Sequence, residues 1–436
     1  MTDPGATEPL VLARPDHTLS RKQIDQGALK VLYRLHQAGF RACLVGGSVR
    51  DLLLGRRPKD FDVATSARPG QVRKLFRNSR IIGRRFRLAH IYFRDGIVEV
   101  STFRRDPDPE AQASAPGELL ITNDNVFGTP REDAFRRDFG INALFYDIAD
   151  YSVIDYVGGI KDLERRTIRV IGDPDLRFRE DPVRMTRACE LAARLDFTIE
   201  AATQDGIGRH AAEILKAAPA RLTEEIGQLL RCGHSGSAMQ WMLELGMLDI
   251  ALPEVEAFLE TRRLGLGDFT CTLGLLDRRV ERGRPLSEIG LYSSLLLPTV
   301  LVRCGERCRE GRDPLSVGGA RDLIADAIGP FFRRFTLSRH KAEQVVQTIL
   351  GFKQMRGRRW KTAERVKFSQ RGFFEDALWL YEIAVAAKGE GDDELRRWRR
   401  VAHARPPSKT SAPRDRPRRR GRRRGRGGRG RRRARR

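Results

Sequence analysis

Two aspartates separated by one residue, Asp60 and Asp62, stand in the first fifth of the chain. Residues two apart in a β-strand project from the same face, because side chains alternate along a strand. Two carboxylates held that close repel each other unless a cation lies between them. Hard divalent cations such as Mg²⁺ prefer oxygen ligands of this kind. The spacing of Asp60 and Asp62 therefore predicts a divalent-cation site.

A glycine pair, Gly46-Gly47, precedes these aspartates by about a dozen residues. It follows a short apolar run, 42–45, and leads into a stretch with a helical pattern, 48–54, which Gly55 closes. A strand, a glycine turn and the start of a helix together offer free backbone N–H groups to an anion. A phosphate-binding turn followed closely by a metal-binding carboxylate pair predicts a nucleotidyltransferase.

A third carboxylate is expected beside the first two, on a neighbouring strand. Glu99 lies in a segment, 97–103, whose side chains alternate as in a strand, and is one candidate. Asp138, in the run Arg136-Arg137-Asp138-Phe139, is the other. Periodicity alone does not choose between them.

Three polar residues, Asp181, Arg184 and Arg187, follow one another at intervals of three where a helix is expected to open. This spacing places them on one helical face. An aspartate that accepts and an arginine that donates can complement the edge of a nucleobase. The alternative is an ordinary surface ion pair, which the spacing by itself favours.

The chain has 436 residues, 40% of them hydrophobic, and a net charge of +25. Such a charge predicts a polyanionic partner. Residues 411–436 hold fifteen arginines and one aspartate, a net +14, and we expect a disordered tail over 401–436 that binds phosphate backbones without sequence preference.

The six cysteines are scattered, which predicts free thiols, and no apolar run is long enough for a membrane span. We therefore expect a cytoplasmic protein without a membrane partner.

The fold class expected is α+β: a nucleotidyltransferase head with a small mixed antiparallel sheet and helices, then an all-α body and the basic tail. Ser20 and Gln23 form a capping-box signal for the first helix, and amphipathic segments mark later ones. The aromatic residues of 331–335 and Trp360 are expected to be core more often than base-stacking groups. The predicted divisions are a disordered leader (1–19), the catalytic head (20–155), a nucleotide-recognition neck and RNA-binding helical domain (156–260), a helical RNA-binding body (261–400) and the tail (401–436).

Five motifs in order make the chain resemble the class II tRNA nucleotidyltransferases and bacterial poly(A) polymerases: LVGGSVRD (44–51), DFD (60–62), RRDFGINAL (136–144), DYVGGIKDL (155–163) and EDPVRMTRA (180–188). The resemblance covers about residues 20–260. Four segments resemble the poly(A) polymerase branch: residues 82–90, residues 332–335, the Trp360 region and the arginine tail. Gly140, where the family more often has threonine, and Thr186 with Cys189 depart from the pattern.

The resemblance implies roles for these residues. Asp60 and Asp62 would hold Mg²⁺, and Asp138 would be the third catalytic acid, with Glu99 as second choice. Gly46, Gly47 and Ser48 would face the triphosphate of the substrate ATP. Asp181 and Arg184 would read the base. Arg137 would contact the nucleotide from beside the site, and Arg187 would support it. Arg50 would either lock the turn with Asp51 or reach a phosphate.

The function predicted in this way is template-independent polyadenylation of RNA 3′ ends with ATP, which marks RNA for decay. Its partners would be RNA 3′ ends of any sequence and proteins of RNA decay. The alternative is a CCA-adding tRNA nucleotidyltransferase, since adenine and cytosine offer the same donor–acceptor order to Asp181 and Arg184. An inactive RNA-binding scaffold is the third hypothesis.

Overall fold

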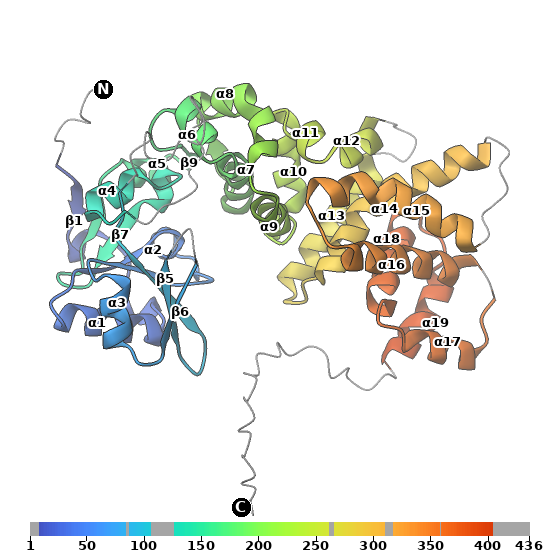
Figure 1. Ribbon diagram of the computed structural model, residues 1–436, viewed down its shortest axis with the longest axis horizontal. Coiled ribbons are helices and arrows are strands. Elements are labelled where there is room, and N and C mark those ends of the chain that lie inside the picture. The colour runs from blue at the N-terminus through green and yellow to red at the C-terminus, as the bar shows by residue number, and fades with distance from the viewer. Residues whose placement is uncertain are drawn as a thin grey trace, which may run out of the picture.

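An eight-stranded mixed sheet forms the amino-terminal head of the computed structural model, which describes residues 8–83, 87–105, 126–260, 266–309, 317–357 and 359–403 (Figure 1). Among these residues the strands run in the order β1-β8-β7-β2-β3-β6-β5-β4, and all neighbours are antiparallel except β3 and β6. The strands are β1 (Leu10–Leu12), β2 (Ala42–Val45), β3 (Asp62–Thr65), β4 (Ser79–Ile82), β5 (Leu88–Tyr92), β6 (Ile97–Thr102), β7 (Leu144–Asp147) and β8 (Val153–Asp155).

Each face of this sheet packs against its own apolar cluster, because alternate residues of a strand point to opposite sides. On one face, Leu44 and Val63 pack with helices α1 (Gln26–Gln37) and α3 (Pro69–Leu75). On the other face, Cys43 and Ala64 join a smaller cluster with α4 (Pro130–Phe135). The central strands β2 and β3 are therefore covered on both sides, which fixes the register of the strand that carries Asp62.

The described part of the expected leader, residues 8–19, is ordered, so the prediction of a disordered leader over 1–19 was wrong there. Strand β1 pairs with β8 at the edge of the sheet, and Leu19 is fully buried. The capping box of Ser20 and Gln23 does form, but it caps a short 3-10 turn. Helix α1 begins after Asp25, whose carboxylate accepts from the N–H groups of two residues in its first turn.

Helices make up nearly all of the described chain beyond the head, as predicted. In the neck these are α5 (Gly159–Glu164), α6 (Pro174–Glu180), α7 (Val183–Leu195), α8 (Ala201–His210), α9 (Pro219–Leu229), α10 (Ser235–Glu244), α11 (Leu248–Ala251) and α12 (Pro253–Glu260), with a two-stranded pairing of β9 (Thr167–Ile168) and β10 (Thr198–Ile199). In the body they are α13 (Leu266–Glu281), α14 (Glu288–Arg309), α15 (Val317–Arg334), α16 (Arg339–Gly357), α17 (Thr362–Ser369), α18 (Phe374–Lys388) and α19 (Asp392–His403).

The predicted boundary of the tail at residue 401 lies inside α19, which continues to His403. Residues 404–436, the remainder of the predicted tail, lie outside the described residues, as do 84–86 of the family-like segment. The aromatic residues of 331–335 are buried, and Trp360 packs against Phe368 and Trp398, so they belong to the core. None of the described helices is long and apolar enough to cross a membrane. The five cysteines whose side chains are described are free thiols.

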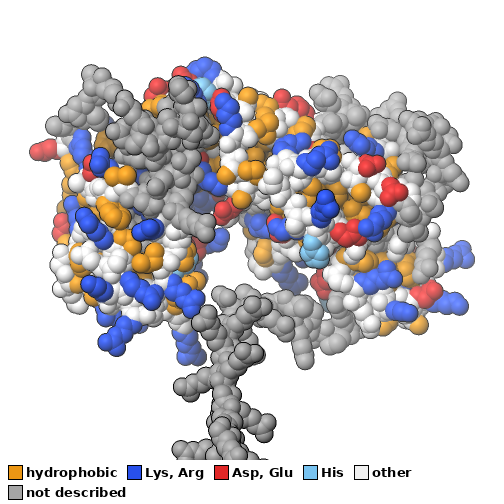
Figure 2. All heavy atoms as spheres, in the orientation of Figure 1, with side chains coloured by type: hydrophobic (Ala, Val, Ile, Leu, Met, Phe, Trp, Pro, Cys, Tyr) orange, Lys and Arg blue, Asp and Glu red, His pale blue; other side chains and the backbone are white. Residues whose placement is uncertain are grey.

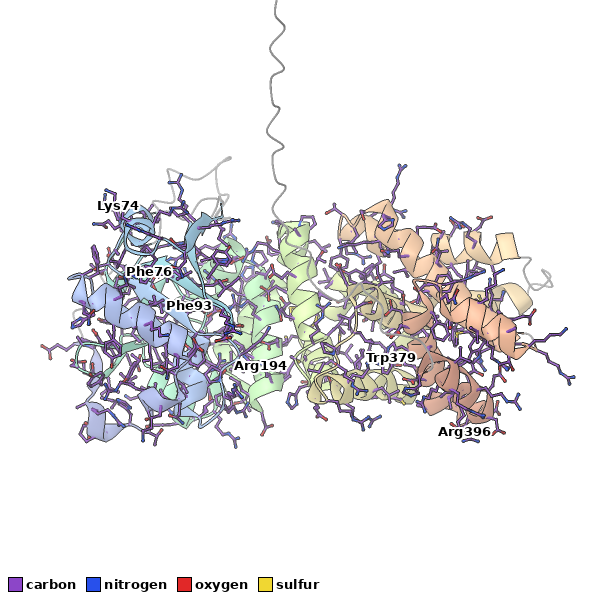
Figure 3. All side chains as sticks on the ribbon, turned by 90° about the horizontal axis from the view of Figure 1, so that it is seen from below. Lys74, Phe76, Phe93, Arg194, Trp379 and Arg396 are labelled. Carbon is purple, nitrogen blue, oxygen red and sulfur yellow. The ribbon has the colours of Figure 1, made fainter. Side chains whose placement is uncertain are left out.

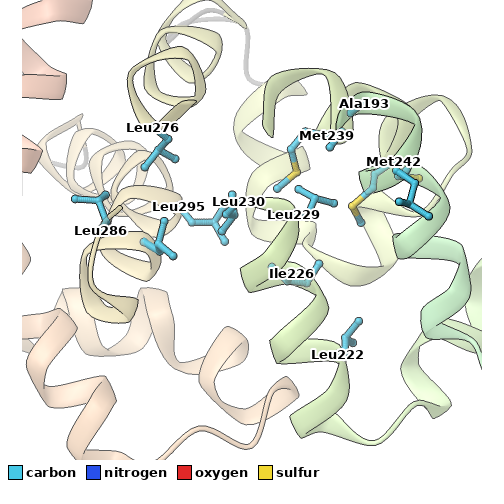
Figure 4. Packing of buried hydrophobic residues seen from close by; sticks show 14 of the residues in the cluster. Ala193, Leu222, Ile226, Leu229, Leu230, Met239, Met242, Leu276, Leu286 and Leu295 are labelled. Atoms are coloured by element: carbon cyan, nitrogen blue, oxygen red, sulfur yellow. The ribbon is translucent and has the colours of Figure 1, made fainter. Parts of the chain in front are cut away.

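Helix α9 joins the neck to the body, because its apolar residues face both ways. Figure 4 shows Leu229 beside Met239 and Leu230 beside Leu295 of α14. An ion pair at 2.9 Å between Glu254 of α12 and Arg334 of α15 reinforces the same joint. The molecule is hollowed between head and body, beneath the neck (Figure 2).

Leu230→Ala should lower the free energy of unfolding by about 2–5 kcal/mol, because Leu230 is only 1% exposed and its loss leaves a cavity between neck and body. Urea denaturation followed by circular dichroism measures this change. Leu215→Ala is the matched control, since Leu215 is 51% exposed and should change stability by less than about 1 kcal/mol. Equal effects of the two substitutions would contradict the shared core.

Candidate active site

The glycine turn lies between β2 and α2 (Gly47–Leu53), as predicted. Gly46 has a φ of +71°, a conformation that residues with a Cβ rarely adopt. A Cβ at Gly46 would also stand 3.3 Å from Nη1 of Arg137. The hydroxyl of Ser48 donates to the carbonyl oxygen of Val45 at 2.8 Å, so the side chain stabilises the turn. The backbone N–H of Ser48 is therefore the group proposed to contact a ligand.

Arg50 is buried behind this turn. Its guanidinium donates to Asp51 at 2.8 Å and to the amide oxygen of Asn142. Nη2 of Arg50 would stand 3.2 Å from a Cβ at Gly47, so the guanidinium lies directly under the turn. Of the two roles expected for Arg50, this geometry supports locking the turn and leaves no approach to a phosphate.

Asp62 opens β3, and Asp60 stands two residues earlier, just before the strand begins. The expectation that both aspartates lie within one strand was therefore wrong by two residues. Across the parallel pairing of β3 and β6, Asp62 is the register partner of Glu99. The carboxylate of Glu99 also lies 3.0 Å from Nε2 of His90 on β5. Asp62 thus has two acidic neighbours, Asp60 two residues earlier in the chain and Glu99 on the adjacent strand.

The electrostatics of Asp62 reflect this crowding. The surrounding protein partly desolvates its carboxylate, and the charges of Glu99 and Asp60 repel it, which together raise its pKa to about 6. The guanidinium of Arg137 acts in the opposite direction. Arg137 is held in place by Asp133, at 2.8 Å, and by the carbonyl oxygen of Asn142. Arg137 therefore lies near both Asp62 and the glycine turn, and a contact with the nucleotide stays a prediction.

Asp138 occupies a different, buried position. One oxygen accepts from the N–H of Phe139 at 2.8 Å and from the amide of Asn142 at 3.1 Å. The other pairs with Arg187 at 2.8 Å. Burial would raise the pKa of Asp138, but Arg187 and the two donors hold it below its usual value. Glu99, the second choice for the third acid, is the register partner of Asp62, whereas Asp138 is bonded to Asn142 and Arg187.

Asp181 ends α6 and stands before α7 rather than on it, so the helical spacing predicted for it was wrong. Its carboxylate forms a two-pronged ion pair with Arg221 of α9, with Nη2 and Oδ2 2.9 Å apart. Arg221 was not identified from the sequence, because it lies 40 residues further along and no local spacing links it to Asp181.

Arg184 is buried on the first turn of α7. Its Nη1 donates to the carbonyl oxygen of Arg177 at 3.0 Å and lies 3.4 Å from Glu180. All of its hydrogen bonds within the described residues use Nη1, so Nε and Nη2 can donate to a ligand. Arg187 on the same helix forms its ion pair with Asp138, and its role as a support for the nucleotide stays a prediction.

The carboxylates at the start of β3 fit a hard divalent cation. Repulsion that raises the pKa of Asp62 is relieved when a cation is bound. No group of three His, Cys, Asp or Glu side chains in the described parts of the chain is arranged as a ready-made metal cage. Mg²⁺ suits such a site, because it commonly takes one or two carboxylates and completes its shell with water and substrate phosphates.

The family-like motif of 155–163 has a structural explanation. The carboxylate of Asp155 accepts from four successive backbone N–H groups, of residues 157–160, at 2.9–3.0 Å. Gly140 lies against this turn, and a Cβ there would stand 2.0 Å from Oδ2 of Asp162. Gly140 differs from the family pattern because Asp162, in its ion pair with Arg169 at 2.8 Å, fills the space that a side chain at residue 140 would need.

Asp62→Asn should stabilise the EDTA-treated protein at pH 8 by about 1 kcal/mol, a small value because the exposed side chain is screened by solvent. The raised pKa means that the ionised form destabilises the fold above pH 6, and this penalty shrinks between pH 6 and pH 4. Thermal unfolding measured from pH 4 to pH 8 should show that the stability gained by Asp62→Asn shrinks between pH 6 and pH 4.

Asp138→Asn is the contrasting variant. The lowered pKa of Asp138 means that its ionised form stabilises the fold. Asp138→Asn leaves Arg187 unpaired, so the free energy of unfolding should fall by about 3 kcal/mol throughout pH 5–8. Stabilisation by Asp138→Asn, or destabilisation by Asp62→Asn at pH 8, would contradict these assignments.

A mixed sheet that carries carboxylates beside a glycine turn, followed by a helical neck, defines the class of nucleotidyltransferases. The family model described as "Poly A polymerase head domain" matches residues 42–169, which include the turn and the carboxylates. A second model, "Probable RNA and SrmB- binding site of polymerase A", matches residues 196–259 of the neck.

Similar proteins come from two groups. Poly(A) polymerase I of Salmonella typhi is 49% identical over 252 residues, which are 57% of this chain and 54% of that protein. A CCA-adding enzyme of Bacillus velezensis is 33% identical over 255 residues, 58% of this chain and 62% of that protein. The chain thus spans little more than half the length of the curated relatives it matches.

Among solved structures, the Bacillus stearothermophilus CCA-adding enzyme in complex with CTP has the same fold, with a TM-score of 0.62 and 24% identity over 87% of this chain and 82% of that one. The helical body is included in that likeness, which extends well beyond the sequence matches. Residues 42–169 and 196–259 are thus similar to two domains of poly(A) polymerases, and the fold is that of the CCA-adding enzyme.

Proposed function

We propose that this protein transfers AMP from ATP to the 3′-hydroxyl of RNA without a template. The observation that carries the proposal is the position of Asp62, which is the register partner of Glu99 on β6 and of Val45, the residue just before the glycine turn, on β2. In the reaction the 3′-oxygen bonds to the α-phosphorus of ATP, the bond from that phosphorus to the pyrophosphate oxygen breaks, and pyrophosphate leaves. The 49% identity to poly(A) polymerase I supports adenylation in particular.

We expect two aspartates to hold the metal ion and the residues around the glycine turn to bind the triphosphate. Mg²⁺ held by Asp60 and Asp62 would lower the pKa of the 3′-hydroxyl and stabilise charge on the α-phosphate. The backbone N–H groups of Gly47 and Ser48 and the guanidinium of Arg137 would face the triphosphate, since they surround the same turn.

We assign the role of third acidic residue to Glu99, because it neighbours Asp62 in register. Asp138 is then a positioning residue, since its oxygens hold Asn142 and Arg187 in place. This reverses the order of preference that the family resemblance implied.

Recognition of the base falls to Arg184, with Asp181 as its constrained neighbour. The two-pronged ion pair with Arg221 fixes the orientation of the Asp181 carboxylate. Arg184 keeps donors for ring nitrogens. We expect this fixed orientation to favour one nucleotide over two.

The test is single-nucleotide extension of an RNA with an unpaired 3′ end, with ATP and CTP supplied separately. We expect long products with ATP and almost none with CTP. Asp62→Ala should reduce the rate roughly 10³-fold, the scale of losing one electrostatic contact to the transition state, while RNA affinity measured by filter binding stays within twofold. Asp95→Ala, in the exposed connection between β5 and β6, is the control.

Two results would redirect the proposal. CTP addition before ATP, confined to tRNA lacking its 3′ end, would identify a CCA-adding enzyme, which the 33% identical relative and the shared fold make the second candidate. Equal loss of RNA binding and activity in Asp62→Ala would remove the separation between metal binding and RNA binding.

Arg221→Ala should raise CTP use relative to ATP by roughly tenfold, because a freed Asp181 can follow the smaller pyrimidine and gain a charged hydrogen bond of about 1.5 kcal/mol. Competition between the two nucleotides in the extension assay measures the ratio. Arg209→Ala, which removes an exposed ion pair with Asp175 on neighbouring helices, should leave the ratio unchanged. A constant ratio in Arg221→Ala would show that the ion pair does not set selectivity.

A further inference from the structure

A basic cavity of about 650 Å³ lies in the C-terminal body, between α13, α18 and α19. Figure 3 marks Trp379 of α18, which lies on its wall, within the body. The positively charged or titratable residues that line the cavity are Arg278, Arg279, Arg282, Arg284, Arg399 and His403. We call this site the arginine cavity.

The positive charge of the arginine cavity is largely uncompensated. Of its two acidic residues, Glu382 pairs with Arg399 at 2.8 Å. Asp392 pairs with Arg396, which is not among the lining residues. Within the described residues, Arg278, Arg282 and Arg284 form no side-chain hydrogen bond or ion pair. Like charges this close repel one another, so an anionic ligand would be bound favourably.

The aromatic wall of the cavity is closed to bases. The guanidinium of Arg279 covers the ring of Trp379, with its carbon 4.8 Å from the ring centre. The indole N–H of Trp379 donates to Ser294 at 2.9 Å, and the side chain is only 4% exposed. A nucleobase therefore has no free ring face for stacking there, and recognition falls to the guanidinium groups. Guanidinium forks match phosphate oxygens in pairs.

The net positive charge of the lining favours an anionic occupant. The chain's own segment 411–436 carries a net +14 and would be repelled. Guanidinium groups without a partner among the described residues suit the phosphates of a nucleic acid backbone. RNA is the polyanion that the proposed reaction supplies.

We propose that the arginine cavity binds the phosphate backbone of the RNA at a distance upstream of its growing 3′ end. This inference rests on the proposed function for the identity of the polyanion. It assigns to the body a sequence-independent contact that holds long RNA while the 3′ end stays in the head. Short RNA that occupies only the head would not reach it.

The test compares binding of oligoadenylates of 6 and 24 nucleotides to the full chain by fluorescence anisotropy. The double variant Arg278→Gln/Arg282→Gln removes two cationic groups of the cavity. For the 24-mer we expect roughly a tenfold loss of affinity at 0.1 M salt and a fall of about 1.4 in the slope of log affinity against log salt, from two single-strand phosphate contacts. For the 6-mer the change should stay below twofold.

Arg303→Gln/Arg333→Gln is the matched control, since both residues are exposed arginines of the body, on α14 and α15, outside the cavity. The control should bind both RNAs as the unaltered protein does. Equal binding of the 24-mer by the two double variants, or equal losses for the 6-mer and the 24-mer in Arg278→Gln/Arg282→Gln, would overturn the proposal. Tighter binding of a 24-residue polyglutamate than of the 24-mer, lost in the same variant, would assign the cavity to an acidic protein instead.

These readouts need no catalysis, so the two proposals fail separately. A protein that binds the 24-mer through the arginine cavity but extends no RNA would contradict the proposed function alone. A protein that extends RNA with ATP, with unchanged 24-mer binding in the double variant, would contradict the cavity alone.

Discussion

One buried amide, that of Asn142, connects the parts of the site. Its oxygen accepts from Arg50 beneath the glycine turn, and its nitrogen donates to Asp138. Asp138 in turn pairs with Arg187 on α7 of the neck. The turn that is proposed to hold phosphates and the helix proposed to read the base are thereby joined through three side chains. Buried polar groups that satisfy one another in this way permit few alternative arrangements.

The carboxylates at the start of β3 show the opposite situation. Asp62 and Glu99 are placed next to each other by strand register, although their charges repel. Hydrogen bonds and an ion pair lower the pKa of Asp138, whereas desolvation and the charges of Glu99 and Asp60 raise the pKa of Asp62. Sites that bind cations commonly carry such local destabilisation, because the same repulsion becomes affinity when the cation is present.

The body matters to the site through α9. This helix carries Arg221, which holds Asp181, and it also carries apolar residues that pack into the body. Any movement of the body that displaces α9 would therefore act on the ion pair of Arg221 with Asp181. On the proposed function, this ion pair would couple nucleotide selection to the region where we place the upstream RNA contact. The curated sequence matches cover 57–58% of this chain, whereas the likeness in fold covers 87% of it.

Local sequence determined the elements of this protein and most members of its site. The glycine turn, the aspartate pair and the helices of neck and body follow from backbone freedom, charge spacing and apolar periodicity, which act over a few residues. The pairing of Asp62 with Glu99 depends on which strands become neighbours, and the ion pair of Asp181 with Arg221 depends on how α9 packs against the start of α7. Only the tertiary structure decided these pairings, because charges distant along the chain meet only after the sheet and the helices have assembled.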